Sequence, residues 1–79
     1  MKETFKEKVA SELRAFRAKS NLTQKEVANI AGIDIMTVAR YENNSTSMQL
    51  DMLEKILSVY KIPLDIFFTS VSANMQRYD

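Results

Sequence analysis

The sequence has no cysteine and no histidine, and it has only one glycine and one proline among its 79 residues. The absence of cysteine excludes disulfides and thiolate metal sites, and the absence of histidine removes the commonest metal ligand and general base. We therefore expect no enzyme, no metal site and no cofactor. No apolar run has the length of a membrane span or a signal-peptide core, so we expect a cytoplasmic protein with no membrane partner.

The length of the chain is that of one small domain. We expect residues 1–79 to form this single domain, with a core at 5–68, a recognition unit at 23–43 and a short tail at 69–79. The net charge is only +1, but it is unevenly distributed. Residues 1–40 hold eight Lys/Arg against five Asp/Glu, which gives +3, and the remaining residues hold three against five, which gives −2. The basic charge thus lies on the half that contains the recognition unit.

Two short helices joined by a tight turn are predicted within the recognition unit. Thr23 and Glu26 have the spacing of a capping box, and Asp34 can cap the start of a second helix. Gly32 allows the left-handed backbone that ends the first helix. A turn of this kind sets two helices at a steep angle and leaves the start of the second helix protruding. This is the shape that enters the major groove of DNA.

Apolar periodicity predicts three further helices. We expect helices at about 3–19, 24–31, 35–43 and 48–60, and a fifth helix that begins near Pro63. Small polar residues predict a loop at 43–47. The sequence leaves the tail open, because Val71 and Met75 have helical spacing whereas the serines beside Val71 weaken that prediction.

The sequence from Leu13 to Phe68 resembles the helix-turn-helix domain of phage Cro and repressor proteins and their bacterial relatives, the xenobiotic-response-element-like family. The matching residues are Leu13, Phe16, Arg17, Leu22, Thr23, Gln24, Glu26, Val27, Ala28, Gly32, Ile33, Val38, Arg40, Glu42, Asn43, Leu64, Asp65, Phe67 and Phe68. The resemblance implies an all-α, five-helix lambda-repressor-like domain that binds double-stranded DNA as a homodimer and regulates transcription. The compact size looks most like the restriction–modification controller proteins of this family.

The resemblance also implies a DNA-binding surface with three parts. Its members are Thr23, Gln24 and Lys25 before and at the start of the first helix, Ile35, Met36, Thr37 and Arg40 on the recognition helix, and Asn43, Asn44 and Ser45 in the loop. Many relatives have a glycine at the position of Asn44, and asparagine is the best substitute in a left-handed turn. They often have a basic residue at the position of Ser45, so the neutral serine should weaken phosphate attraction.

Ile35 and Met36 depart from the family pattern, which often has Gln, Arg, Ser or Lys at these positions. Two interpretations stay open. The two side chains could pack on thymine methyl groups, or they could be partly buried or bind a protein. Arg40 could contact a guanine or only a phosphate.

Arg17 and Glu42 match a family pair that forms a partly buried salt bridge between the helix at 3–19 and the end of the recognition helix. We expect the same pair here, and Arg17 is also a candidate for a phosphate contact. A planar guanidinium suits this geometry better than an ammonium group.

The fifth helix and the tail carry more apolar side chains than one small core is expected to absorb. We expect Ile66, Phe67 and Val71 at a two-fold dimer interface, with Phe68 alternatively in the monomer core. The main alternative to DNA binding is a helix-turn-helix module or antitoxin whose apolar surface binds a protein partner. The low net charge and the uncharged loop favour that alternative.

Overall fold

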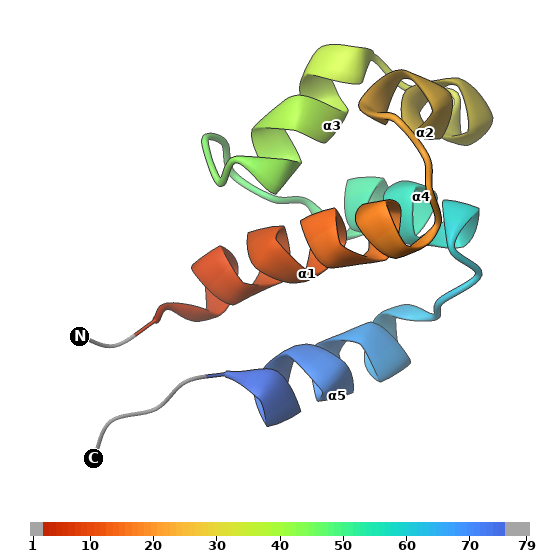
Figure 1. The fold of residues 1–79 in the computed structure, drawn as a ribbon. Helices are drawn as coiled ribbons and strands as arrows, with labels where there is room; N and C mark the ends of the chain where they lie inside the picture. The colour runs from red at the N-terminus through yellow and green to blue at the C-terminus, as the bar shows by residue number, and fades with distance from the viewer. Residues whose placement is uncertain (1–2, 76–79) are drawn as a thin grey trace.

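The computed structural model describes residues 3–75, in which five α-helices are joined by short loops (Figure 1). The helices are α1 (Phe5–Lys19), α2 (Gln24–Ala31), α3 (Ile35–Glu42), α4 (Leu50–Val59) and α5 (Leu64–Asn74). This described part contains no strand, so the expected all-α, five-helix fold is confirmed. The last four positions of the predicted tail, 76–79, lie outside the described residues.

Side-chain caps fix where the first three helices begin. The hydroxyl of Thr23 accepts a hydrogen bond from the Glu26 N–H at 3.1 Å, and the Glu26 carboxylate accepts from the Thr23 N–H at 2.9 Å. This is the predicted capping box. Asp34 caps α3, as predicted, by accepting from the Met36 N–H at 2.8 Å. A second capping box, at Thr4, starts α1 two residues later than the sequence predicts.

Within residues 3–75, left-handed backbone ends the helices or turns the chain at four positions. Gly32 has a φ of 71°, and it ends α2 as predicted. Asn21 and Asn44 have φ values of 56° and 55°, so both asparagines adopt the conformation that they tolerate better than most residues. Lys61, with a φ of 59°, is the exception, because its side chain gives no such signal.

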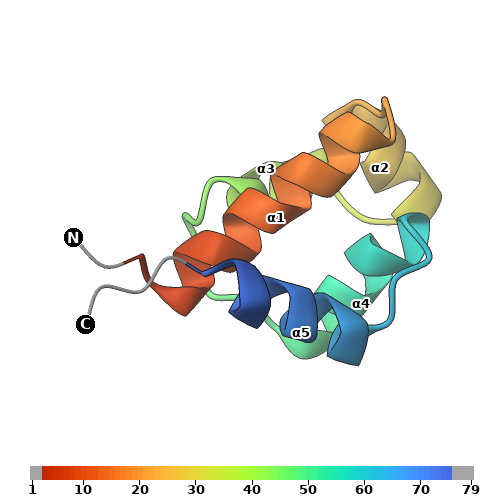
Figure 2. The same cartoon turned by 60° about the horizontal axis from the view of Figure 1, so that its bottom comes forward.

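The hydrophobic core is formed by side chains from all five helices. Its buried side chains are Val9, Leu13, Val27, Ala28, Val38, Tyr41, Leu53, Ile56, Leu57, Phe67 and Val71. α1 contacts α3 on one side and α5 on the other, and α2 contacts both α3 and α4. Figures 1 and 2 show α5 running beside α1, with the α2–α3 pair at a distance from α5. α1 therefore connects the recognition unit to the C-terminal helix.

Two residues of the predicted dimer interface belong to this core instead. Phe67 and Val71 are fully buried within one chain, so their assignment to an intermolecular surface was wrong. The reason is that α5 continues to Asn74 along α1, which gives it a longer buried face than the sequence indicates. Ile66 points away from this face and is 57% exposed. Phe68 is half-buried against the core.

α4 and α5 meet at a sharp bend of 92°. Pro63 caps the start of α5, one position before the first-turn place that the sequence predicts. Among residues 3–75, no single helix is long and apolar enough to cross a membrane, and only this bent pair taken together passes the same test of length and composition.

Candidate nucleic-acid interface

The outward face of α3 carries three exposed side chains with different chemistry. Met36, Arg40 and Asn43 are spaced four and three residues apart, so they lie on one side of the helix. The opposite side, formed by Val38, Tyr41 and Glu42, is buried. This outward face is apolar at the start of α3 and polar at its end.

Ile35 and Thr37 flank this face. Ile35 is 41% exposed and Met36 is 51% exposed, so about half of each residue is in contact with water. Thr37 is half-buried. Ile35 and Met36 are therefore both partly buried and partly exposed, and both interpretations, contact with thymine methyl groups or contact with a protein, stay predictions.

The start of α2 lies close to the end of α3. The Gln24 amide donates a hydrogen bond to a carboxylate oxygen of Glu42 at 3.1 Å, although the two residues are eighteen positions apart. Lys25 is exposed, and the Thr23 hydroxyl is engaged in the cap of α2. The first turn of α2 is thereby tied to the recognition helix.

A buried carboxylate joins three helices at this point. Glu42 is 2% exposed, and its two oxygens accept hydrogen bonds from the Arg17 Nε at 3.1 Å and 2.8 Å. The predicted ion pair between α1 and the end of α3 is therefore present, at 2.8 Å. The hydrogen bond to Glu42 raises the pKa of the Arg17 guanidinium above its ordinary value. Arg17 also donates from Nη1 to the Leu22 carbonyl at 3.1 Å, so its two bonded nitrogens are directed to structural partners.

Arg14 adds a contact that the sequence does not predict. Its guanidinium donates to the backbone carbonyl of Glu42, the last residue of α3. A cation near the end of a helix satisfies a carbonyl that has no partner within the helix. Arg14 lies one turn before Arg17 on α1, and this i,i+3 spacing was the one available sign that both could face α3.

The loop after α3 keeps the shape that the sequence predicts. Asn43 is exposed, and Asn44 turns the chain with its left-handed backbone. The Ser45 N–H donates to the Arg40 carbonyl at 3.0 Å, which closes the loop onto the last turn of α3. The Asn44 side-chain oxygen is buried without a hydrogen-bond partner among the described residues.

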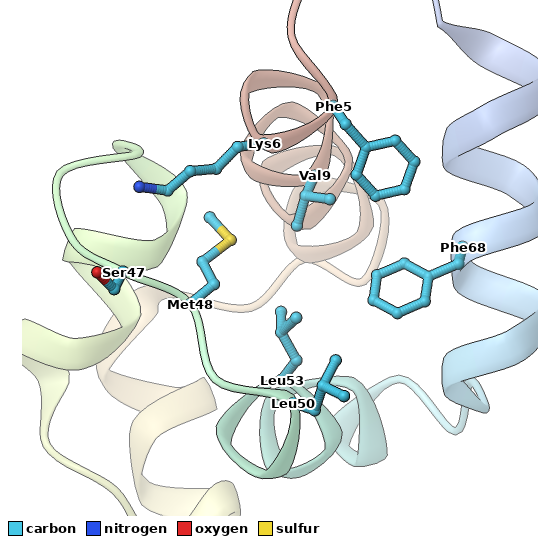
Figure 3. A pocket seen from close by; sticks show the side chains of 8 residues that line it. All are labelled: Phe5, Lys6, Val9, Ser47, Met48, Leu50, Leu53 and Phe68. Carbon is cyan, nitrogen blue, oxygen red and sulfur yellow. The ribbon is translucent and has the colours of Figure 1, made fainter.

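An apolar groove lies between the start of α1, α4 and α5, beside Ser47 and Met48 (Figure 3). Its volume is about 480 Å³. The Phe5 and Phe68 rings line one wall with their centroids 5.8 Å apart, and Leu50 is 60% exposed at the start of α4. Within residues 3–75, no group of three or more acidic side chains is arranged to hold a metal ion.

A short helix held across a second one by a glycine turn, with its outer face exposed, defines a helix-turn-helix protein. The chain belongs to the helix-turn-helix family of Cro-type and repressor-type DNA-binding regulators, because a family model described as helix-turn-helix matches residues 13–67. This family consists of regulators and not of enzymes, in agreement with the expectation from the sequence.

Known relatives share the sequence or the fold. The chain is 34% identical over 68 residues to the cryptic phage CTXphi transcriptional repressor RstR of Vibrio cholerae, an alignment that covers 86% of this chain and 61% of RstR. A tyrosine-to-phenylalanine mutant of the restriction-modification controller protein C.Esp1396I superposes with a TM-score of 0.84 at 22% identity, over the whole of both chains. The clp gene regulator ClgR of C. glutamicum superposes with a TM-score of 0.82 at 16% identity, over 96% of this chain and 97% of ClgR. The two structural likenesses show the fold.

Proposed function

We propose that this chain is a transcriptional regulator that binds a palindromic operator as a homodimer. The observation that carries the proposal is the outward face of α3, which is exposed and rigidly placed. Met36, Arg40 and Asn43 lie on it, while Glu42 on the buried side is held by Arg17 and Gln24. A helix that is fixed in this way can enter a major groove without a costly rearrangement.

The relatives support this function. RstR is a transcriptional repressor, although the chain spans only about three-fifths of its length. C.Esp1396I has been solved as a tetramer on its natural 35-base-pair operator, a structure that superposes on this chain with a TM-score of 0.81 at 21% identity over 90% of this chain and 93% of that one. It has also been solved on a 25-base-pair operator site.

Each residue of the predicted DNA-binding surface has a role in the proposed complex. Lys25 and the free side of the Gln24 amide contact phosphates beside the groove, together with the backbone at Thr23. Arg40 contacts a guanine edge or a phosphate, and Thr37 supplies polar contacts nearby. Asn43, Asn44 and Ser45 form a loop that follows the phosphate backbone. Ile35 and Met36 meet the base edges first.

A homodimer suits both the surface and the size of the chain. One recognition helix reads only a short half-site, and two-fold symmetry places a second helix about 34–36 Å away, one turn along the DNA. Ile66 is 57% exposed on α5 and supplies apolar surface for the partner chain.

The test of this function is the dependence of DNA affinity on salt. Fluorescence anisotropy with a random duplex, and then with sequences selected from a random pool, should show binding at about 50 mM salt that weakens as salt is raised. About 6–10 phosphate contacts are expected for a dimer, with a slope of about −0.9 per neutralised charge, but several contacts here are neutral amides, so fewer ions should be released than contacts made. A slope of zero, or no binding at low salt, contradicts the proposal.

Binding of a protein partner is the second candidate, and one observation favours it. Ile30 is 63% exposed at the end of α2, and Ile35 and Met36 are also exposed, so the helix-turn-helix unit carries three large apolar side chains in contact with water. If the random and selected duplexes both fail to bind, this candidate replaces the first one.

A further inference from the structure

The start of α3, which contacts DNA in the proposed complex, carries the large apolar side chains of Ile35 and Met36. Met36 lies on the side opposite the buried Val38, and 51% of it is exposed. Exposed apolar side chains that cluster at one place usually mark a contact surface. The surface in question is the two-residue tip formed by Ile35 and Met36.

The tip is held in place before any partner arrives. The Asp34 carboxylate accepts from the Met36 N–H, so the backbone of the first turn of α3 is fixed by a cap. Arg40 follows one turn later on the same side as Met36, and it is exposed. An apolar group and a cation are thus presented about one helical turn apart.

The chemistry of the tip restricts what it can recognise. The side chain of Ile35 has no hydrogen-bonding group, and the Met36 thioether is only a weak acceptor. Neither can distinguish bases by their pattern of donors and acceptors. In the major groove, the apolar group that a base edge offers is the C5-methyl of thymine.

We propose that Ile35 and Met36 recognise thymine by packing on its C5-methyl group, and that Arg40 supplies the polar contact to the neighbouring base pairs. The inference rests on the proposed DNA-binding function and makes it more specific, because it assigns at least one thymine in each half-site to the start of α3. The polar neighbours Arg40 and Asn43 favour a base edge over an apolar protein surface, since a purely apolar partner would leave both without partners.

The experiment removes the methyl group without changing base pairing. An operator is first selected with the full chain from a random pool, and each thymine is then replaced by deoxyuracil, one position at a time and symmetrically in both half-sites. For each contacted methyl, affinity should fall about fourfold, or about sixteenfold when both half-sites are changed. Thymines in the same duplex but outside the selected operator are the internal control, and their replacement should not change the affinity.

Variants assign the effect to residues. Met36→Ala and Ile35→Ala should each affect a single operator position. At that position the ratio of the affinity for thymine to the affinity for uracil should fall toward a value of 1. Ile30→Ala is the matched control, because it truncates a large apolar side chain outside α3 that is even more exposed, at 63%, and it should leave the ratio unchanged. Circular dichroism and the free energy of unfolding establish that each variant is folded.

Two outcomes overturn the inference while leaving DNA binding intact. In the first, the wild-type chain binds the selected operator equally well with uracil at every position, a result that depends on no variant. In the second, the loss of affinity persists undiminished when both Ile35 and Met36 are alanine, so other groups read the methyl. Failure to bind any duplex is distinguishable from both, because it overturns the proposed function and this inference with it.

Discussion

Tyr60 has a buried hydroxyl that no group among the described residues bonds. Its ring stacks on Phe16 with the centroids 6.1 Å apart. Burial raises the pKa of Tyr60 from 10.0 to about 12, and the nearby Glu42 charge adds to this shift while Arg17 opposes it. Among the described residues, Tyr60 therefore contributes packing against the core and no side-chain hydrogen bond.

A pH-dependent stability follows from this raised pKa. Between about pH 10 and 12 the folded chain keeps the Tyr60 proton, whereas the unfolded chain loses it. The contribution of Tyr60 to the free energy of unfolding is therefore complete below about pH 10 and is lost as the pH rises toward 12. Tyr60→Phe should leave the free energy of unfolding at neutral pH unchanged or slightly higher, and should make its decline above pH 10 less steep. Urea unfolding at neutral and alkaline pH measures both. Parallel declines for the two proteins contradict the prediction.

Breaking the Arg17–Glu42 ion pair should change the free energy of unfolding at neutral pH by more than Tyr60→Phe does. Arg17→Met keeps much of the volume but leaves the Glu42 carboxylate buried, with the Gln24 amide as its remaining side-chain partner. We expect a loss of about 3 kcal/mol in the free energy of unfolding. Adding Glu42→Gln removes the stranded charge and should restore part of this loss. A double variant less stable than Arg17→Met would show that the charge is not the cause.

Single residues were predictable from the sequence where a motif or a resemblance identified them. The Thr23 and Asp34 caps followed from spacing alone, because a cap joins residues two or three positions apart. The contact of the Arg14 side chain with the backbone carbonyl of Glu42 links residues 28 positions apart, and its one sign in the sequence is the i,i+3 spacing of Arg14 and Arg17. The exposure of Met36 likewise required the packing of α3 to be known.

At the scale of the elements, the turn between α2 and α3 determines how the recognition helix is presented. A Cβ atom at Gly32 would meet nothing within 4 Å, so space does not limit this position and only its φ of 71° does. Gly32→Ala should therefore lower the free energy of unfolding by about 1–2 kcal/mol, the cost of left-handed backbone for a residue with a side chain.

Gly32→Asn is the matched control for this prediction, because asparagine fills the same open space but tolerates left-handed backbone better. It should cost clearly less than Gly32→Ala in the same urea titrations. Equal costs would mean that side-chain size, and not φ, limits the turn.

The bounds of the helices show what local signals can and cannot define. α2 was predicted at both ends, since Thr23 and Gly32 mark them. α5 was predicted only at its start, because its continuation to Asn74 depends on packing along α1. One example is the hydrogen bond at 3.2 Å from the Ser70 hydroxyl to Glu12, 58 positions away in the sequence.

At the scale of the whole molecule, the apolar side chains of α5 divide between two tasks. Phe67 and Val71 complete the core of one chain, whereas Ile66 faces outward. The sequence predicted an apolar excess on this helix but not its division, because the direction in which α5 crosses α1 decides which side is buried. An aspartate at Val71 would place a carboxylate in the core, so it could not separate dimerisation from folding.

Ile66→Asp can test dimerisation separately from folding. The side chain is exposed, so we expect the free energy of unfolding of the monomer to change little, while an aspartate on each chain opposes its symmetry mate and weakens the dimer. Phe67→Ala should instead lower the free energy of unfolding by about 3–5 kcal/mol, because it opens a cavity in the core.

Sedimentation equilibrium at micromolar concentration measures the dimer. It should show a dimer for the wild type and for Ala18→Asp, a control on an exposed site of α1, and a monomer for Ile66→Asp. A wild-type chain that remains monomeric at high concentration contradicts the homodimer. A dimer that is unaffected by Ile66→Asp places the interface elsewhere on the surface.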